Sequence, residues 1–353
     1  MGTLESGIWS FGLTKARDQK TIGNCTKFSV NKMSAEKKNV LLFGLGAIGG
    51  FYAFILGRNE NVSLSVVARS NYESVKANGL RIESQNHGNQ TVKIDQVLKS
   101  PSESRIKFDY IVCAHKAVNP DKIPPLFQSC VDANTTFVII QNGVGNEEPF
   151  RTLFPQNSIL SCVTWVGATQ TAPGLIKHTK SEDMQMGLFA NPQVDGKVEQ
   201  ARLDTFAGLL RQGGTVFQVE GNIQVKRWEK VVWNAAWNPL TTLTDVDTQT
   251  WLHSSAEAEG MTRRLMREVI DVARRCEVPI GYELVDELMR KINSVPGIFS
   301  SMHTDSKEGR PLEVDVILGY PMKKAREFGM DLPTLTAVYA MTMAVNGRLQ
   351  SKL

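Results

Sequence analysis

The sequence predicts an α/β protein, with a doubly wound parallel sheet in its first half and an all-helical second half. Short apolar runs at residues 39–43, 62–67, 108–113 and 136–140 have the length and composition of buried parallel strands. Helical segments alternate with these runs, which is the pattern of right-handed crossover connections. Beyond residue 222 the apolar residues recur with helical spacing towards the end of the chain.

Composition excludes several classes of protein. The 353 residues include 40 Lys and Arg against 36 Asp and Glu, and this net charge of +4 predicts no nucleic-acid partner. No apolar run approaches the roughly 20 residues that cross a bilayer, so we expect a soluble protein without a membrane partner. The 5 cysteines form no C-x-x-C pair and the 5 histidines no H-x-x-x-H motif. We therefore expect no disulfide framework, no metal site and a cytoplasmic location.

The chain is predicted to divide into three segments. Residues 1–37 show no sustained period, and we expect them to form a disordered N-terminal extension. Their excess of basic residues leaves a mitochondrial targeting segment as an alternative, and Met33 is an alternative start. Residues 38–221 are predicted to form the α/β domain, and residues 222–353 the helical domain.

The later elements follow in order. Residues 158–188 contain short strands joined by turn residues, so we expect the sheet to finish with an antiparallel segment. Residues 215–219 form one more strand-like run. Pro239 is expected to end or kink the first helix of the helical domain. The helices of this domain are predicted at residues 222–238, 255–276, 282–293, 312–328 and 333–349.

A glycine-rich turn joins the first predicted strand to the first helix. Gly44, Gly46 and Gly49 form a G-x-G-x-x-G motif, in which the glycines permit a tight turn, close approach of a pyrophosphate and helix–strand contact. The N-terminus of the helix would offer N–H groups to the phosphates. The alternative is a strand–helix turn that binds nothing. The motif thus predicts a Rossmann-type dinucleotide site made by Gly44, Leu45, Gly46, Ala47, Ile48 and Gly49.

The second predicted strand indicates which dinucleotide binds. NAD-binding folds usually end this strand with an acidic residue that binds the ribose 2′-hydroxyl. This chain has no acid there and has Arg69, whose guanidinium suits a 2′-phosphate, so we expect NADPH as the cofactor. A solvated surface arginine is the alternative. Lys116 follows the strand that ends at residue 113 and is a second candidate cation at the ligand-binding edge of the sheet.

A polar stripe runs along an otherwise apolar helix. Lys230, Asn234 and Asn238 are spaced by four residues, so all three project from one side of the helix predicted at residues 222–238. Asparagine is a poor helix former and is costly to bury without a partner. The stripe therefore resembles the wall of a polar pocket, although two amides that bond a neighbouring loop are the alternative.

Two further segments could close this pocket. Asn142 follows the strand ending at residue 140 and could meet a nicotinamide, unless it belongs to an ordinary Asn-Gly turn. Glu313 lies in the first turn of a predicted helix, where the helix dipole alone would favour a carboxylate. From the residues alone, capping is the better explanation for Glu313.

Taken together, these motifs resemble those of the ketopantoate reductase family, the 2-dehydropantoate 2-reductases. The resemblance covers roughly residues 39–349 and follows the family's order: G-x-G-x-x-G, Lys after a strand, Q-N-G, W-x-K-x-x-x-N-x-x-x-N-P-L-T, S-S-M-x-x-D and G-R-x-x-E-x-D. It implies reduction of a 2-keto acid to an (R)-2-hydroxy acid by NADPH in a cleft between the two domains. A homodimer is a possible assembly, which the sequence does not decide. It also implies roles for single residues: Lys230 and Glu313 catalytic, Asn234, Asn238 and Ser301 substrate-binding, and Asn142, Arg69 and Lys116 cofactor-binding.

The expected mechanism follows from the charge that develops in the reaction. As hydride reaches the keto carbon, negative charge grows on the keto oxygen, and a lysine ammonium stabilises it and supplies the proton. Burial would lower the pKa of Lys230 while Glu313 would raise it, so the two effects oppose each other.

Departures from the family pattern bear on the substrate. Ile298 stands where the family often has an asparagine, which removes a partner for the hydroxyl group of ketopantoate. Trp233 and Trp237 are bulkier than the residues usual at their positions. We expect 2-dehydropantoate as the substrate, with a branched-chain acid such as 2-ketoisovalerate as the alternative. A third alternative is an NADPH-binding sensor without turnover, which the presence of Lys230 and Glu313 disfavours.

Overall fold

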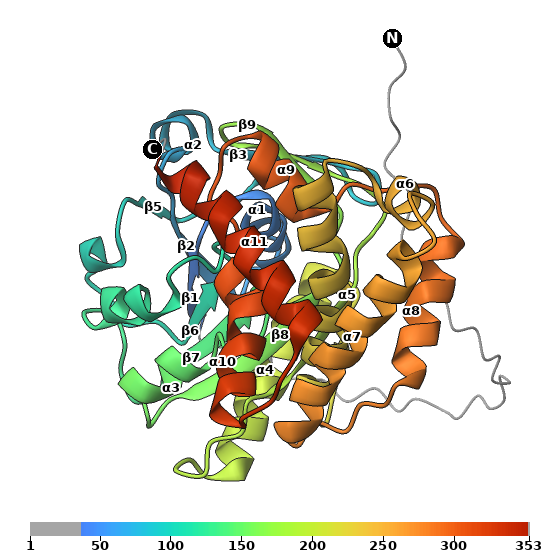
Figure 1. The fold of residues 1–353 in the computed structure, drawn as a ribbon. Helices are drawn as coiled ribbons and strands as arrows, with labels where there is room; N and C mark the ends of the chain where they lie inside the picture. The colour runs from blue at the N-terminus through green and yellow to red at the C-terminus, as the bar shows by residue number, and fades with distance from the viewer. Residues whose placement is uncertain (1–36, 352–353) are drawn as a thin grey trace, which may run out of the picture.

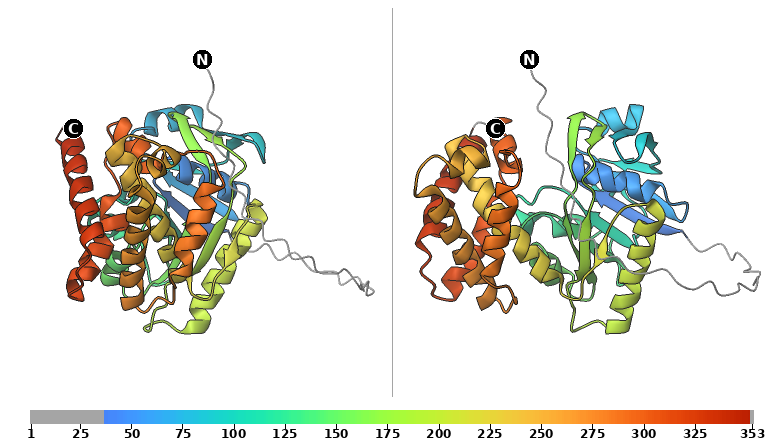
Figure 2. Two further views of the ribbon diagram at one scale, coloured as in Figure 1. Left: turned by 45° about the vertical axis from the view of Figure 1, so that its right-hand side comes forward. Right: turned by 90° about the vertical axis from the view of Figure 1, so that its right-hand side faces the viewer.

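The computed structural model describes residues 37–351, and within them the chain forms an α/β part followed by a helical part, as predicted (Figure 1). The predicted N-terminal extension lies outside the described residues except for residue 37. Figure 2 shows the helical part beside the α/β part, with helix α5 (Ile223–Thr244) between them. None of the helices within the described residues is long and apolar enough to cross a membrane.

The main sheet has the strand order β12-β11-β8-β7-β6-β1-β2-β5. From β5 to β8 all neighbours are parallel, β11 is antiparallel to β8, and β12 is parallel to β11. The chain leaves β1 towards β2 and β5 and returns to β6, so the order reverses between β1 and β6, where ligands bind in such sheets. The strands are β1 (Lys38–Phe43), β2 (Val62–Val67), β5 (Gln96–Leu98), β6 (Tyr110–Cys113), β7 (Thr136–Ile140), β8 (Ser158–Thr164), β11 (Met184–Leu188) and β12 (Gln218–Val219).

The register of these strands gathers their carboxyl ends at one edge. Phe43 pairs with Val67 on one side and with Cys113 on the other, and Cys113 pairs with Ile139. The segments that follow β1, β2, β6 and β7 therefore begin next to one another. These are the segments that hold the predicted cofactor residues.

A second sheet was not predicted from the sequence. It has the order β4-β3-β10-β9 and is formed by β3 (Leu80–Ser84), β4 (Gly88–Val92), β9 (Ala168–Ala172) and β10 (Leu175–His178). The prediction that residues 158–188 finish the main sheet is thus correct for β8 and β11 and wrong for β9 and β10. The physical reason is a second apolar surface on α1 (Ala47–Gly57): a Cβ on Gly50 would lie 2.5 Å from the side chain of Ile176, so α1 packs closely against this sheet.

The first helix of the helical part runs past the proline that was expected to end it. α5 continues through Pro239 to Thr244. Residues 231–242 are buried, so packing outweighs the missing N–H of the proline. Three threonines after it also bond preceding backbone carbonyls, at Trp237, Asn238 and Leu240. Tertiary packing, which a local signal does not include, decides the length of this helix.

The predicted helix 312–328 begins later and contains a π turn. Helical structure starts at Val314, continues as the π-helical segment η4 (Asp315–Gly319) and then as α10 (Tyr320–Glu327). Pro321 has no N–H, and the wider turn before it lets the amide of Tyr320 bond the carbonyl of Asp315. The other α-helices are α2 (Tyr72–Asn78), α3 (Glu148–Leu153), α4 (Gly196–Gly213), α6 (Thr248–Leu252), α7 (Ala258–Arg275), α8 (Glu283–Asn293), α9 (Ser301–Lys307) and α11 (Pro333–Gln350). Short 3₁₀ turns are η1 (Pro101–Glu103), η2 (Pro120–Lys122) and η3 (Pro124–Phe127).

The α/β part and the helical part each have apolar cores of their own. One core covers the face of the main sheet that packs on α1 and α4, a second covers its opposite face, and a third lies among the helices. α5 belongs to the helical core and also contacts β8 and β11. Because α5 touches both parts, it is the element that can carry side chains from the helical core to the carboxyl edge of the sheet.

Candidate functional site

The glycine turn separates into positions that the fold requires and one that it does not. Gly44 has a φ of +100°, and a Cβ there would lie 2.4 Å from the backbone nitrogen of His115. A Cβ on Gly49 would lie 1.8 Å from the carbonyl oxygen of Gly44. The tight turn and the close packing of α1 therefore demand glycine at both positions.

Gly46 has no such structural reason to be glycine. Its φ of −85° and ψ of −159° are accessible to any residue, and a Cβ there would meet no heavy atom within 4 Å. It is the N-cap of α1 without a side-chain cap, and the first turn of α1 carries no acidic residue. The open space at Gly46 and the uncapped helix N-terminus are compatible with close approach of a pyrophosphate, which remains a prediction.

The residues between the glycines of the turn differ in their exposure to solvent. Leu45 is buried and its carbonyl accepts a bond of 2.7 Å from Asn71, so only its backbone borders the turn. Ala47 and Ile48 open α1 and are partly exposed. The predicted cofactor residues of the turn thus lie together at the carboxyl end of β1, and their contact with a cofactor remains a prediction.

Arg69 follows the second strand of the sheet, and its contact with a 2′-phosphate remains a prediction. It is exposed, two residues beyond the end of β2. His115 packs against Gly44. Burial lowers the pKa of His115 to about 4, and the positive charge of Arg69 acts in the same direction. Arg69 therefore lies next to the glycine turn, and His115 stays neutral beside it.

Lys116 lies at the same edge but pairs with the helical part. Its ammonium forms an ion pair with Asp305 of α9, and Arg310 binds the same carboxylate. The Asp305 side chain is only 4% exposed, so these cations compensate a buried charge. The predicted contact of Lys116 with a cofactor is thus accompanied by a contact between the two parts of the protein.

The polar stripe of α5 lies where the sheet meets the helical core. The Lys230 ammonium donates to the carbonyl of Thr164 at the end of β8 and lies 4.8 Å from the centre of the Trp165 ring. Asn234 and Asn238 are buried. The side-chain amide nitrogen of Asn234 is buried without a hydrogen-bond partner among the described residues. A buried amide donor of this kind suits an oxygen atom of a ligand.

The structure resolves the opposing effects on Lys230. Burial lowers the pKa of Lys230 to about 7, and the charges of Arg227 and Lys291 act in the same direction. Glu313 acts against them, but with a smaller effect than burial. Desolvation therefore prevails, and the lysine has the pKa of a group that exchanges protons near neutral pH.

Glu313 connects the two sheet-edge loops to the helical part. One carboxylate oxygen accepts the backbone N–H of Ala117 at 3.0 Å, and the other accepts the side-chain amide of Asn142 at 3.1 Å. Glu313 precedes the helical segment that starts at Val314, so the expectation that it sits in the first helical turn is wrong. Its carboxylate bonds loops of the α/β part and does not cap its own helix. Glu313 and Asn142 are thus in direct contact, and the charge of Glu313 also acts on Lys230.

Ser301 is the first residue of α9, and its side chain is exposed. The preceding Ser300 has the structural role: its hydroxyl caps α9 by accepting the N–H of His303 and receives a bond from Thr241 of α5. Ser301 is therefore left accessible to a ligand, and a contact with the substrate carboxylate remains a prediction.

Sequence reasoning missed a buried ion pair one turn before the lysine. Arg227 and Glu147 are each 1% exposed, with 2.7 Å between guanidinium and carboxylate. The Arg227 guanidinium also donates to the carbonyls of Ile139, Gln141, Gly143 and Cys162. It thereby fixes the start of α5 to the carboxyl ends of β7 and β8. Its place three residues before Lys230 was a signal, because both project from one side of the helix.

Sequence reasoning also missed Trp165, whose ring lies against Lys230, and a second lysine on the same ring. Lys291 of α8 lies 4.8 Å from the centre of the Trp165 ring and 5.1 Å from that of Trp233. Trp233 in turn contacts Trp237 edge to face at 5.7 Å between ring centres. Lys291 gave no signal in the sequence because α8 reads as an ordinary amphipathic surface helix.

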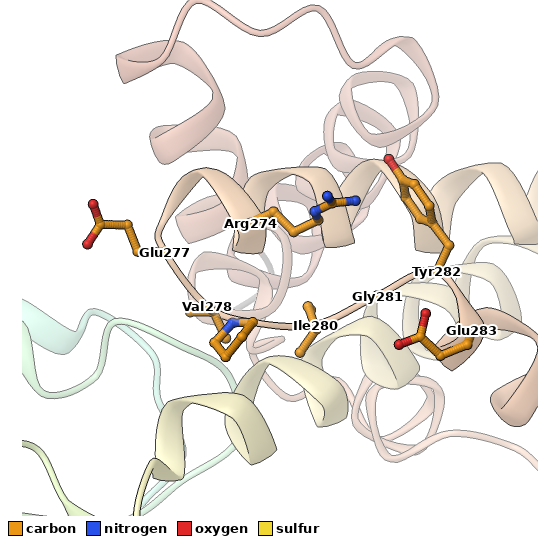
Figure 3. A pocket seen from close by; sticks show the side chains of 8 residues that line it. Arg274, Glu277, Val278, Ile280, Gly281, Tyr282 and Glu283 are labelled. Atoms are coloured by element: carbon orange, nitrogen blue, oxygen red, sulfur yellow. The ribbon is translucent and has the colours of Figure 1, made fainter.

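A hollow elsewhere on the helical part contains none of these residues. It has a volume of about 580 Å³ and is lined by residues 274 and 277–283 at the connection between α7 and α8. Figure 3 shows the carboxylates of Glu277 and Glu283 towards opposite ends of this connection, with Arg274 and Tyr282 above it. The predicted site residues therefore define a different place, at the carboxyl edge of the sheet.

Comparison with known proteins matches both parts of the chain. The model of the ketopantoate reductase PanE/ApbA family matches residues 40–191, and its C-terminal model matches residues 222–346. The 2-dehydropantoate 2-reductase of Nostoc sp. is 27% identical over 321 residues, which make up 89% of this chain and 96% of the relative. An uncharacterized Saccharomyces cerevisiae protein, YDL144C, is 26% identical over 344 residues, or 89% of this chain and 95% of that protein.

Comparison with solved structures supports the same family. The crystal structure of 2-dehydropantoate 2-reductase from Methylococcus capsulatus is 33% identical, with a TM-score of 0.78 over 88% of this chain and 97% of that chain. A D-mandelate dehydrogenase in a ternary structure with NADH and anilino(oxo)acetate shares the fold, at 23% identity and a TM-score of 0.77 over 88% of this chain and 99% of that chain. The chain belongs to the ketopantoate reductase PanE/ApbA family of oxidoreductases.

Proposed function

We propose that the protein reduces a 2-keto acid to an (R)-2-hydroxy acid with NADPH, and that Lys230 is the general acid. The observation that carries this proposal is that Lys230 lies at the end of β8 with the charge of Glu313 acting on it, and that the Asn234 amide nitrogen, on the same face of α5, is buried without a partner among the described residues. In this proposal residues 38–221 bind the cofactor, and residues 222–353 supply the substrate site. When bound, the nicotinamide supplies the hydride.

In this proposal each site residue has a distinct role in the reaction. Lys230 stabilises the negative charge that grows on the keto oxygen and transfers its proton to that oxygen. Glu313 offsets the positive charge of Lys230 and fixes Asn142 at 3.1 Å. The amide nitrogen of Asn234, which has no partner in the part of the chain that the structure describes, is available to a substrate oxygen. Asn238 and Ser301 extend the same wall.

Arg69 supports NADPH over NADH. It is exposed at the end of β2 beside the glycine turn, where a guanidinium can bind a 2′-phosphate with two parallel hydrogen bonds. His115 next to it is neutral because its pKa is lowered to about 4, so the arginine is the cation that would recognise the phosphate.

The preferred substrate is 2-dehydropantoate, the substrate in the name of the Nostoc and Methylococcus relatives. The second candidate, a branched-chain acid such as 2-ketoisovalerate, is favoured by Ile298. This side chain is partly buried against the helical core and offers no hydrogen bond to a substrate hydroxyl. A site without that bond loses its preference for the hydroxylated acid.

Oxidation of NADPH by purified protein, followed by absorbance, tests the proposal. The panel contains 2-dehydropantoate, 2-ketoisovalerate and 2-ketoisocaproate, each with NADPH and with NADH. We expect turnover of at least one acid and a preference for NADPH that the Arg69→Ala variant loses by about tenfold or more, the size of one charge-assisted contact. Arg58→Ala, an arginine of the α/β part at the C-terminus of α1, is the control. Absence of turnover with every acid would leave a cofactor-binding sensor as the function.

A further inference from the structure

Two buried side-chain donors without acceptors lie on α5. The amide nitrogen of Asn234 and the indole nitrogen of Trp237 are buried, and neither has a hydrogen-bond partner within residues 37–351. Asn234 is 6% exposed and Trp237 is 1% exposed. Buried polar groups in folded proteins are nearly always bonded, because a donor that leaves water without a new partner costs free energy. Two such donors on one helix therefore call for an acceptor.

Helix geometry places both donors on the same face as Lys230. Asn234 is four residues and Trp237 seven residues beyond Lys230 on α5. At 100° a residue, Asn234 lies about 40° to one side of Lys230 and Trp237 about 20° to the other side. Residues three apart are neighbours on a helix surface, so the side chains of Asn234 and Trp237 adjoin each other. The two N–H donors and the ammonium group thus share one strip of α5.

Packing explains the size of Trp237 but not its N–H. The Trp237 ring contacts that of Trp233 edge to face at 5.7 Å between centres and belongs to the helical core. A core position of this kind needs the area of an aromatic ring, which phenylalanine also supplies without a donor to desolvate. The unpaired indole N–H therefore points to a role in binding.

A carboxylate is the group that suits this strip. Its two oxygens accept several hydrogen bonds, and each bond is strengthened by the charge of the acceptor. The ammonium group of Lys230 supplies the opposite charge on the same face. In a 2-keto acid the carboxylate and the keto oxygen are borne by adjacent carbons. A molecule with its keto oxygen at Lys230 is thus able to place its carboxylate further along the strip.

We propose that Trp237 is a substrate-binding residue whose indole N–H donates to the carboxylate of the 2-keto acid, together with the amide of Asn234, while Lys230 faces the keto oxygen. The proposal rests on the proposed function and deepens it, because it assigns part of the selection of a 2-keto acid to a side chain that the sequence distinguishes only by its bulk.

The test is Trp237→Phe, which keeps an aromatic ring and removes the N–H. Oxamate carries the carboxylate of a 2-keto acid but is not reduced, and calorimetric titration in the presence of NADPH measures its binding. We expect the Kd for oxamate and the KM for a reducible acid to rise by about 10- to 100-fold, the range of one hydrogen bond to a charged group, with much smaller changes in kcat and in NADPH affinity.

Trp228→Phe is the matched control. Trp228 is buried on the opposite side of α5, where its ring lies 6.3 Å from that of Tyr320, and its replacement should leave oxamate binding unchanged. Equal oxamate affinity of Trp237→Phe and wild type, or an equal loss in both variants, would overturn the proposal.

A second readout needs no substitution in the protein that is measured. In wild type labelled with ¹⁵N-tryptophan, the indole N–H signal of Trp237, identified by its absence in Trp237→Phe, should move to lower field when oxamate is added. The signal of Trp228 should stay in place. A Trp237 signal that does not move at saturating oxamate contradicts a bond to the carboxylate.

These measurements separate failure of this proposal from failure of the proposed function. Oxamate binding that depends on Trp237 supports the carboxylate site even if no acid of the panel is reduced. Reduction of an acid with the same KM in wild type and in Trp237→Phe refutes the site and leaves the proposed function intact.

Discussion

Arg227 and Lys230 are two cations on the same helix, one turn apart, in opposite surroundings. The Arg227 side chain is 1% exposed and meets Glu147, Ser161 and four backbone carbonyls. Lys230 donates to the backbone oxygen of Thr164 and lies over the Trp165 indole, and Glu313 acts on it at longer range. One cation is fully compensated and the other is not.

The comparison shows how one helix can hold a structural charge and, under the proposed function, a reactive charge side by side. A buried charge with a carboxylate and several carbonyls around it is compensated and fixes the position of the chain. A desolvated ammonium with few partners has a lowered pKa and gives up its proton readily. The positive charge of Arg227 also lowers the pKa of Lys230, so the structural residue tunes the reactive one.

The largest expected effect is on the reactive side. Lys230→Met should lower kcat by about 10²- to 10⁴-fold, because the proton donor is lost, and should leave the thermal unfolding temperature unchanged or higher, because no charge then has to be desolvated. Steady-state kinetics and a thermal melt measure both. Lys226→Met, which removes a partly exposed lysine paired with Glu229 on the same helix, is the control. A rate within about tenfold of wild type would assign the proton to another group.

The next largest expected effect is on the stability of the fold, through Arg227. Arg227→Met should lower the free energy of unfolding by about 3–5 kcal/mol, because Glu147 is then buried without its cation. The double variant Arg227→Met with Glu147→Leu should recover a large part of this loss. Urea unfolding measures the difference. As a control, Arg263→Met breaks the more exposed pair with Glu259 and should lower the free energy of unfolding by less than about 1 kcal/mol. A similar loss for both arginines would show that burial gives Arg227 no special structural role.

The smallest expected effect is a shift of the pH profile. Since Lys230 must be protonated to act as the acid, kcat/KM should be constant below its pKa of about 7 and fall as the pH rises above it. Glu313→Gln removes the charge that raises this pKa, so the fall should move to lower pH. Arg227→Met removes a charge that lowers it, so the fall should move to higher pH. Shifts in the same direction for both variants would contradict the assigned electrostatics.

Much of the fold could be predicted because its signals are local. The apolar runs of β1, β2, β6 and β7 and the glycine turn after β1 are contiguous in the sequence, and the structure confirms the α/β and helical halves. The second sheet was missed because β3 pairs with β10, a strand far along the chain, and neither strand has a distinctive apolar run. The prediction that the helix ends before Pro239 was wrong, because the burial of α5 outweighs the local preference of one residue.

The candidate site shows the same division. Helix geometry alone places Lys230, Asn234 and Asn238 on one face of α5, and the G-x-G-x-x-G spacing alone specifies the turn at the start of α1. For these features the sequence was sufficient, because the regular backbone geometry of a few neighbouring residues determines them.

Only the tertiary structure decided which charges these residues meet. The pairing of Arg227 with Glu147, the approach of Lys291 to Trp165 and the use of Glu313 to join two loops all link segments that are distant in the chain. The pKa of Lys230 depends on how much water is excluded around it and on how near these charges lie. Both quantities arise from packing between elements, so no run of neighbouring residues encodes them.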